Sequence, residues 1–293
     1  MSTGRTILRA TALAALLSAA YMAMQQPSRA LADQRMPDLR VPSGPISPPL
    51  AGTVILPTSG EAPPANPFGL PCGLTLHAEA MPGAMVALDV MAPCRPDMRV
   101  EVEHAGLTIA ARTDAVGLLT LDFPAFETPA FFTIRLADGE EAVTLVGLPD
   151  LVDIDRVAVS WDGDVAVDLH GFERGAAFGA PGHVWQAAPG SPEAAAIGTG
   201  GFLTRLGDPS MTESRLAQVY SFPRNLPEAP RISVDIAVTD GTCGEPVTAN
   251  GHRIAESGRI DTYPITLVMP GCDAVGDYLV LQNVFEAPRL TAN

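Results

Sequence analysis

Residues 99–123 read RVEVEHAGLTIAARTDAVGLLTLDF, and the spacing of their apolar side chains decides the fold class. Three short runs, 100–102, 107–111 and 119–123, place an apolar residue at every second position, and turn-forming glycine and aspartate separate the runs. This period of two is typical of half-buried antiparallel strands, which turn one face to a core and the other to water. The sequence therefore predicts an all-β protein.

The same pattern extends over residues 72–148, which we interpret as one β-sandwich domain. Further alternating runs lie at 74–78, 86–90, 132–136 and 143–145. Strands spaced by about 8 to 12 residues, with turn residues between them, favour an immunoglobulin-like or transthyretin-like sandwich of about seven strands. No tryptophan lies between Cys72 and Cys94, so the antibody-type hallmark is missing and the strand topology stays open.

Residues 149–293 form a second predicted β-rich domain, with a junction near Pro149. Its apolar runs are 157–161, 165–169, 202–206, 216–222, 232–238, 265–269 and 278–284. A long segment rich in glycine and alanine, 171–201, interrupts them. Within it, Ser191 and Pro192 are suited to the N-cap and first position of a short helix that ends at Ala196.

The N-terminus predicts export. Residues 1–32 carry Arg5 and Arg9, an uncharged apolar run at 10–24 and a small-residue cleavage motif, as a signal peptide does. The alternative is an uncleaved anchor that holds the protein in the inner membrane through residues 10–24. Residues 33–71 are rich in proline and predict an extended linker.

Charge limits the partners. Without residues 1–32 the chain holds 15 basic and 33 acidic residues, a formal charge of −18, which disfavours nucleic acid and anionic lipid. We expect a protein partner in the cell envelope and membrane contact only through the N-terminal segment. Every basic residue apart from histidine is arginine, so phosphate-binding loops and Schiff-base chemistry that need lysine are excluded.

Four cysteines, Cys72, Cys94, Cys243 and Cys272, lie in the exported part of the chain. An even number in an oxidising compartment favours disulfides, for which three connectivities are possible. We favour Cys72–Cys94 with Cys243–Cys272, because each pair then falls within one predicted domain. A zinc site made of all four thiolates is the rival, although no C-x2-4-C pair supports it.

The sequence offers no strong catalytic or metal motif, and we predict no catalytic residue, metal or cofactor. The best metal-like group is Asp162, Asp164, Asp168 and His170, which also suits the solvated face of a hairpin. None of the five histidines has a zinc spacing, and no G-x-S-x-G motif occurs. A serine–histidine–aspartate triad assembled across the fold stays open, because geometry defines such sites.

The segment Gly182-His183-Val184-Trp185 is the one candidate ligand loop. His183 and Trp185 stand in the glycine-rich segment, where an indole and an imidazole can form a stacking or hydrogen-bonding surface. In the alternative, Trp185 folds back and closes the end of the sandwich.

Several short motifs also resemble a known family. They are Pro-Gly-Ala-Met-Val (82–86), Ala-Pro-Cys (92–94), Gly-His-Val-Trp (182–185), Gly-Phe-Leu (201–203), Arg-Leu-Gly-Asp-Pro (205–209) and Cys-Asp-Ala-Val-Gly-Asp (272–277). With the signal and the linker, they make the chain similar to a poorly characterised family of exported alphaproteobacterial proteins, sometimes labelled "translocase". The resemblance spans nearly all of the mature chain and implies no particular activity.

These observations favour a non-enzymatic binding or structural module of the cell envelope, in the periplasm or outside the cell. A hydrolase with a site built on the loops around His183 and Trp185 is the main alternative. The family label suggests a third role, as an accessory component of a secretion apparatus.

Overall fold

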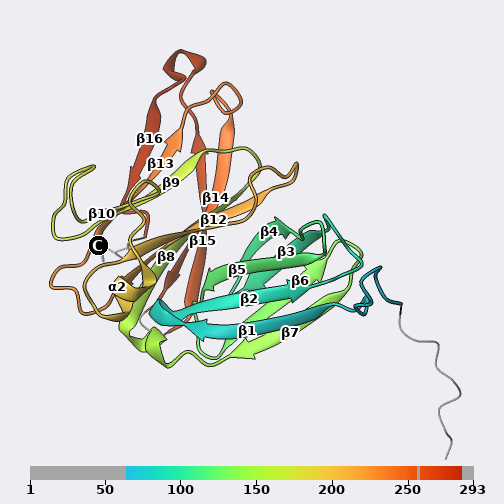
Figure 1. Cartoon of the computed structure of the whole chain (residues 1–293). Helices are drawn as coiled ribbons and strands as arrows, with labels where there is room; N and C mark the ends of the chain where they lie inside the picture. The colour runs from blue at the N-terminus through green and yellow to red at the C-terminus, as the bar shows by residue number, and fades with distance from the viewer. Residues whose placement is uncertain (1–63, 256–257, 286–293) are drawn as a thin grey trace, which may run out of the picture. The chain divides into compact units, whose positions relative to one another are not determined.

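Alternating apolar side chains form antiparallel sheets throughout the part of the chain described by the computed structural model, residues 64–255 and 258–285. The prediction of an all-β, sandwich-like fold is confirmed (Figure 1). The predicted signal peptide and the linker up to residue 63 lie outside the described residues. No helix within the described ranges is long and apolar enough to cross a bilayer.

The first sandwich consists of a three-stranded and a four-stranded sheet. The three-stranded sheet has the order β1-β2-β5, with bounds Thr75–Met81, Met85–Met91 and Leu118–Pro124. The four-stranded sheet has the order β4-β3-β6-β7, with bounds Leu107–Arg112, Arg99–His104, Ala130–Leu136 and Glu141–Val146. The sheet of β1, β2 and β5 faces the sheet that contains β3, β6 and β7, as in immunoglobulin-like sandwiches. Strand β4, however, pairs with β3 and not with β5.

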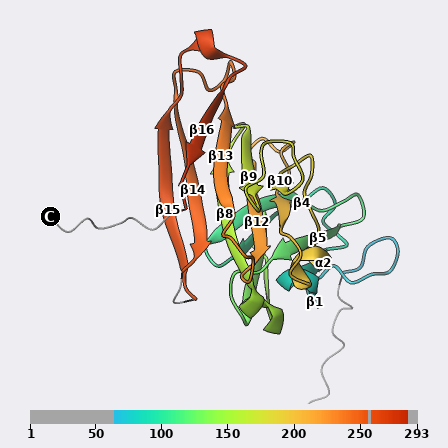
Figure 2. The same cartoon turned by 90° about the vertical axis from the view of Figure 1, so that its left-hand side faces the viewer.

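The second sandwich consists of a four-stranded and a five-stranded sheet (Figure 2). The four-stranded sheet has the order β10-β9-β13-β16, with bounds His183–Val184, Val167–Phe172, Arg231–Ala237 and Tyr278–Gln282. The five-stranded sheet has the order β11-β12-β8-β14-β15, with bounds Phe202–Leu206, Arg215–Pro223, Ile154–Asp162, Pro246–Ile254 and Ile260–Val268.

Helical segments are short. They are η1 (Pro82–Ala84), η2 (Pro149–Asp153), α2 (Pro192–Ala196) and η3 (Cys272–Ala274). The short helix predicted from the glycine-rich segment is confirmed as α2, and the Ser191 hydroxyl oxygen accepts a hydrogen bond from the Ala194 backbone N–H at 3.2 Å.

The two sandwiches share buried side chains. One core lies between the sheets of the first sandwich and continues into β8, β11 and β12 through Ala158, Phe202 and Val219. The other core lies between the two sheets of the second sandwich and includes Val159 and Val234. All described residues belong to one compact unit of the chain, 61–293, in which the two sandwiches share the first of these cores.

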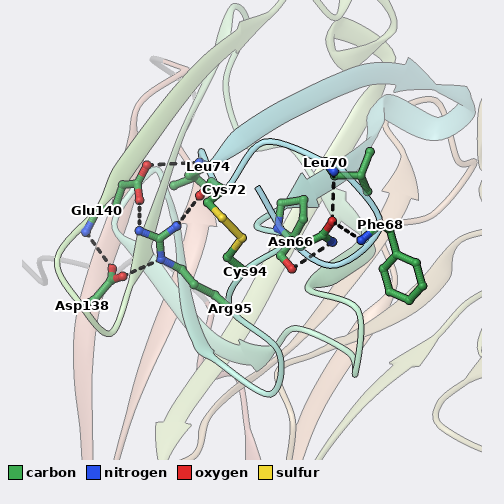
Figure 3. The surroundings of a disulfide bond; sticks show 10 residues. Asn66, Phe68, Leu70, Cys72, Leu74, Cys94, Arg95, Asp138 and Glu140 are labelled. Carbon is green, nitrogen blue, oxygen red and sulfur yellow. Dashed lines mark hydrogen bonds and ion pairs between the residues drawn. A yellow bond between two sulfur atoms is a disulfide. The ribbon is translucent and has the colours of Figure 1, made fainter. Parts of the chain in front are cut away.

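Two disulfides join Cys72 with Cys94 and Cys243 with Cys272, as predicted, at Cα–Cα distances of 5.0 and 4.9 Å. Arg95 lies beside the first disulfide (Figure 3). Its guanidinium donates to the Cys72 carbonyl at 2.7 Å and pairs with Asp138 and Glu140 in the β6–β7 turn. Residue 72 is therefore tied to the sandwich through its backbone as well as its sulfur.

Candidate ligand-binding face

The outer face of the four-stranded sheet carries an unusual set of side chains. Along β9, Val167 and Leu169 point into the core, so Asp168, His170 and Phe172 point outward. In the neighbouring strand β13, the residues opposite these three are Asp235, Ser233 and Arg231. Strand alternation thus gathers two carboxylates, an imidazole, a phenyl ring and a guanidinium on one surface.

Stacked rings continue this surface onto β10. His183 pairs with Phe172 in the register, and their rings are parallel within 2° at a centroid distance of 4.4 Å. On β13, on the other side of Phe172, the Arg231 guanidinium carbon lies 4.0 Å from the ring centroid, which is a cation–π contact. A histidine, a phenylalanine and an arginine therefore form one row across three strands.

A chain of hydrogen bonds runs beneath the rings. The Gly179 backbone N–H donates to His183 Nδ1 at 2.9 Å, so a neutral His183 carries its proton on Nε2. That atom lies 2.9 Å from His170 Nδ1 and donates to it. His170 then carries its own proton on Nε2, which faces the Asp235 carboxylate at 3.5 Å. The network therefore fixes the tautomer of both histidines.

Burial keeps these imidazoles neutral. It lowers the pKa of His170, although the carboxylates of Asp235 and Asp168 act in the opposite direction. The pKa of His183 is also lowered, first by burial and then by the charges of His170 and Arg231. In neutral rings, each nitrogen keeps the donor or acceptor role that these hydrogen bonds need. The loop that contains Gly179 therefore stays bonded to the sheet at neutral pH.

The loop before β10 presents two aromatic side chains above the histidines. Phe178 is 65% exposed, and Trp185 is half-buried. Their rings lie 5.1 Å apart, and the Trp185 ring stacks on His183 at 5.1 Å with an interplanar angle of 10°. We call Phe172, Phe178, His170, His183, Trp185 and Arg231 the histidine–aromatic face.

A buried carboxylate closes the base of the loop. Glu173 is 2% exposed, and its Oε1 accepts from the Tyr220 hydroxyl at 2.9 Å and from the Gly201 backbone N–H at 2.5 Å. Burial and this carboxylate raise the pKa of Tyr220. The Glu173 backbone N–H donates to the Gly182 carbonyl at 2.8 Å and so joins the two ends of the loop.

A polar cleft of about 350 Å³ adjoins the histidine–aromatic face. Its side chains include Trp161, Asp164, Asp168, Gln186, Arg205 and Gln218. Gln186 follows Trp185 in the chain and donates to Asp168 at 3.2 Å, which links the cleft to the stacked rings. The buried indole N–H of Trp161 has no hydrogen-bond partner among the described residues.

The structure places the two predicted ligand residues differently. Trp185 reaches the surface, whereas His183 is 3% exposed and positions the loop from below. The metal-like group does not form a ligand set: His170 turns to His183 and Asp235, and Asp164 and Asp168 line the cleft. Within residues 64–255 and 258–285 no group of three metal-binding side chains occurs.

Sequence reasoning missed Phe172, Phe178, Arg231 and Asp235. Phe172 continues the outward alternation of Asp168 and His170, and the predicted strand 232–238 already implied that Asp235 alternates with buried residues. The missing information was the pairing of β9 with β13, which brings residues 59 to 67 positions apart onto one face.

Comparison of the chain with models of protein families, with curated proteins and with solved structures gives no match.

Proposed function

We propose that this protein is a binding module that holds a carbohydrate chain on its histidine–aromatic face. The observation that carries the proposal is the pair of aromatic rings of the exposed Phe178 and the half-buried Trp185, which lies on a rigid stack of rings next to a polar cleft. The apolar face of a sugar ring packs against aromatic rings, while its hydroxyl groups need nearby donors and acceptors.

The polar groups suit such a ligand. Asp164 and Asp168 offer acceptors, Arg205 offers donors, and Gln186 offers both, all around a cleft large enough for one or two sugar rings. A few placed polar groups beside aromatic surface are what orients a ligand in a binding site.

The face is rigid before any ligand arrives. The bonds from Gly179 through His183 and His170 to Asp235 fix the loop from below, and Glu173 fixes its base. Both nitrogens of His183 are occupied, which weighs against this residue as a general base and favours binding over hydrolysis here. A preorganised surface loses little conformational entropy on binding.

The location is consistent with this role. Two disulfides indicate an oxidising, exported environment. We place the protein in the periplasm or outside the cell, either released or anchored through residues 10–24, where it would meet the glycans of the cell envelope.

Titration with soluble peptidoglycan fragments and a set of envelope polysaccharides tests the proposal. We expect saturable binding that Trp185→Ala and Phe178→Ala each weaken at least about tenfold, as removal of a central aromatic contact does. Phe68→Ala is the matched control, because Phe68 is 78% exposed outside this face. The chain has two tryptophans, and since Trp161 lines the cleft and Trp185 lies on the adjoining face, the change in tryptophan fluorescence follows binding.

The proposal fails if no glycan binds, or if the bound glycan is indifferent to Trp185 and Phe178. Co-purification of a stoichiometric protein partner, with no glycan bound, would instead favour the accessory role in a secretion apparatus.

A further inference from the structure

The face of the five-stranded sheet that points away from the second core holds another set of polar side chains, which the proposed binding site does not use. Ser160 Oγ on β8 lies 2.9 Å from His252 Nε2 on β14. The other ring nitrogen, His252 Nδ1, lies 3.1 Å from Thr262 Oγ1 on β15. A hydroxyl, an imidazole and a second hydroxyl are therefore arranged in line across three adjacent strands.

The sheet register explains this arrangement. Val159 on β8 and Val247 and Ala249 on β14 point into the second core, so Ser160 and His252 point to the opposite face. His252 lies opposite Thr262 in the β14–β15 pair, and Asn250 lies opposite Ser160 in the β14–β8 pair. Directly opposed side chains in antiparallel strands have Cβ atoms about 5 Å apart.

His252 has the protonation state of a general base. It is 2% exposed, and burial lowers its pKa to about 4, so the imidazole is neutral at neutral pH. When Nδ1–H donates to the Thr262 hydroxyl, Nε2 is left to accept the proton of Ser160. Ser160 itself is half-buried and so can be reached from solvent.

The three residues border a cavity of about 270 Å³ between the sandwiches. Gly106 and Thr108, from the β3–β4 hairpin of the first sandwich, form one wall. Ser160, Asn250, His252 and Thr262 form part of the other. A cavity of this size holds a small molecule or one short chain of a larger one, which limits the acyl group that fits.

We propose that Ser160 and His252 are the nucleophile and the general base of a second, catalytic site that hydrolyses short-chain carboxylic esters. Ser160 Oγ forms a bond to the ester carbonyl carbon while its proton passes to His252 Nε2. The carbon–oxygen bond to the alcohol then breaks, and the alcohol leaves with that proton. Water attacks the acyl-serine, gives a proton to Nε2 and releases the acid, and Nε2 returns the proton to Ser160.

Two neighbours have supporting roles. Thr262 is a positioning residue, because it accepts from Nδ1–H and holds the ring toward Ser160. Asn250 faces Ser160 across the β8–β14 pair and lines the same cavity, so its side-chain amide can donate to the oxyanion of the tetrahedral intermediate; Arg215 also lines this cavity. A neutral hydroxyl stabilises an imidazolium less than a carboxylate does, so we expect turnover slower than that of an enzyme with a full triad.

Two measurements on the disulfide-bonded chain test this site: hydrolysis of 4-nitrophenyl acetate, and the mass of the adduct formed with a fluorophosphonate probe. We expect one adduct, on Ser160, and hydrolysis that Ser160→Ala abolishes. His252→Gln should lower kcat/KM at least about 100-fold, the usual contribution of a general base. Ser210→Ala is the control, because Ser210 is an exposed hydroxyl bonded to Asp208.

Thr262→Val separates a positioning role from a structural one. Without the acceptor on Nδ1 the imidazolium is less stable, so the rise of kcat/KM with pH should move to lower pH while the adduct still forms on Ser160. The absence of an adduct on the wild-type protein, an adduct on another residue, or full activity in Ser160→Ala would overturn the proposal. None of these results bears on glycan binding, because Ser160, His252 and Thr262 line neither the histidine–aromatic face nor its cleft.

Discussion

Arg156 donates from its guanidinium to the backbone carbonyl of Ala125, and this bond joins the second sandwich to the first. The Arg156 side chain, on β8, is completely buried. It also donates to the carbonyls of Gly83 and Ala84 and, at 2.8 Å, to the Ser221 hydroxyl. Burial lowers the pKa of Arg156 to about 9, so the group is still a cation at neutral pH, and the carbonyl dipoles of the first sandwich solvate it.

Replacement of Arg156 by Met should therefore weaken the contact between the two sandwiches and lower the stability of the protein. The volume is roughly retained, but the buried carbonyls of Ala125 and Gly83 lose the Arg156 donor, whereas the Ala84 carbonyl keeps the Ala125 N–H, and we expect a loss of about 3 to 5 kcal/mol in the free energy of unfolding. Urea unfolding followed by circular dichroism measures it. Arg135→Met is the control, because Arg135 makes a solvent-exposed ion pair with Glu141 and should change the free energy of unfolding far less. Equal effects of the two substitutions would contradict this account.

The buried histidines should make stability depend on pH. His104 donates from Nδ1 to the Phe131 carbonyl and accepts from the Phe126 N–H at Nε2, both at 2.9 Å, so both nitrogens are satisfied only in the neutral ring. Burial lowers the pKa of His104 to about 4, while the Phe131 carbonyl opposes the shift and Arg156 adds to it. The unfolded chain, with a pKa near 6.5, therefore binds a proton first as the pH falls.

Stability should consequently be constant above about pH 6.5 and fall between pH 6.5 and 4, with His104 contributing about 3 kcal/mol over that range. Thermal unfolding at a series of pH values measures this loss. His104→Gln keeps one donor and one acceptor but does not titrate. The stability of this variant should therefore fall less steeply between pH 6.5 and 4, with about one fewer proton taken up on unfolding. His77→Gln, at an exposed position of β1, should leave the profile unchanged. A His104→Gln profile as steep as that of the wild type would exclude His104 as the source.

Much of the fold could be predicted from the sequence because strand alternation is a local signal. All seven strands of the first sandwich lie where the apolar runs placed them. Strand β14 was missed, because its PVTANGHRI sequence interrupts the alternation with Asn250, Gly251 and His252. Gly251 makes room for the Tyr263 ring, since a Cβ at this position would lie 2.5 Å from that ring in its present position. Tertiary packing, which one sequence does not reveal, outweighed the low strand propensity.

The candidate sites were less predictable for the same reason. His170 and His183 are 13 positions apart, but their bond also requires β10 to fold back on β9. Ser160 and His252 are 92 positions apart, and their contact depends on strand β14, which the alternation did not predict. Only the aromatic character of Trp185 in a glycine-rich loop was visible locally.

Gly171 should be intolerant of any side chain. A Cβ at Gly171 would lie 2.4 Å from the Tyr220 ring, which is fully buried and bonded to Glu173, so an added methyl has no room. We expect Gly171→Ala to cost about 1 to 3 kcal/mol and to weaken glycan binding, because the loop base must shift. Gly251→Ala is the matched comparison, since Tyr263 is only half-buried and can move. A larger loss of stability for Gly251→Ala would contradict this ranking.

The two disulfides should contribute differently to the free energy of unfolding, although the loop-closure entropy predicts nearly equal contributions. From the sequence separations of 22 and 29 residues, the loop-closure entropy of the unfolded chain predicts a stabilisation of about 3 kcal/mol by each disulfide. Loss of Cys72–Cys94 leaves the Arg95 bond to the Cys72 carbonyl in place, so residue 72 stays attached.

Replacement of Cys72 and Cys94 by Ser should thus cost less than replacement of Cys243 and Cys272, and Arg95→Ala should increase that cost. A double-mutant cycle on the free energy of unfolding measures this coupling, which we expect to be at least about 0.5 kcal/mol. Additive effects would mean that the Arg95 network and the disulfide hold the segment independently.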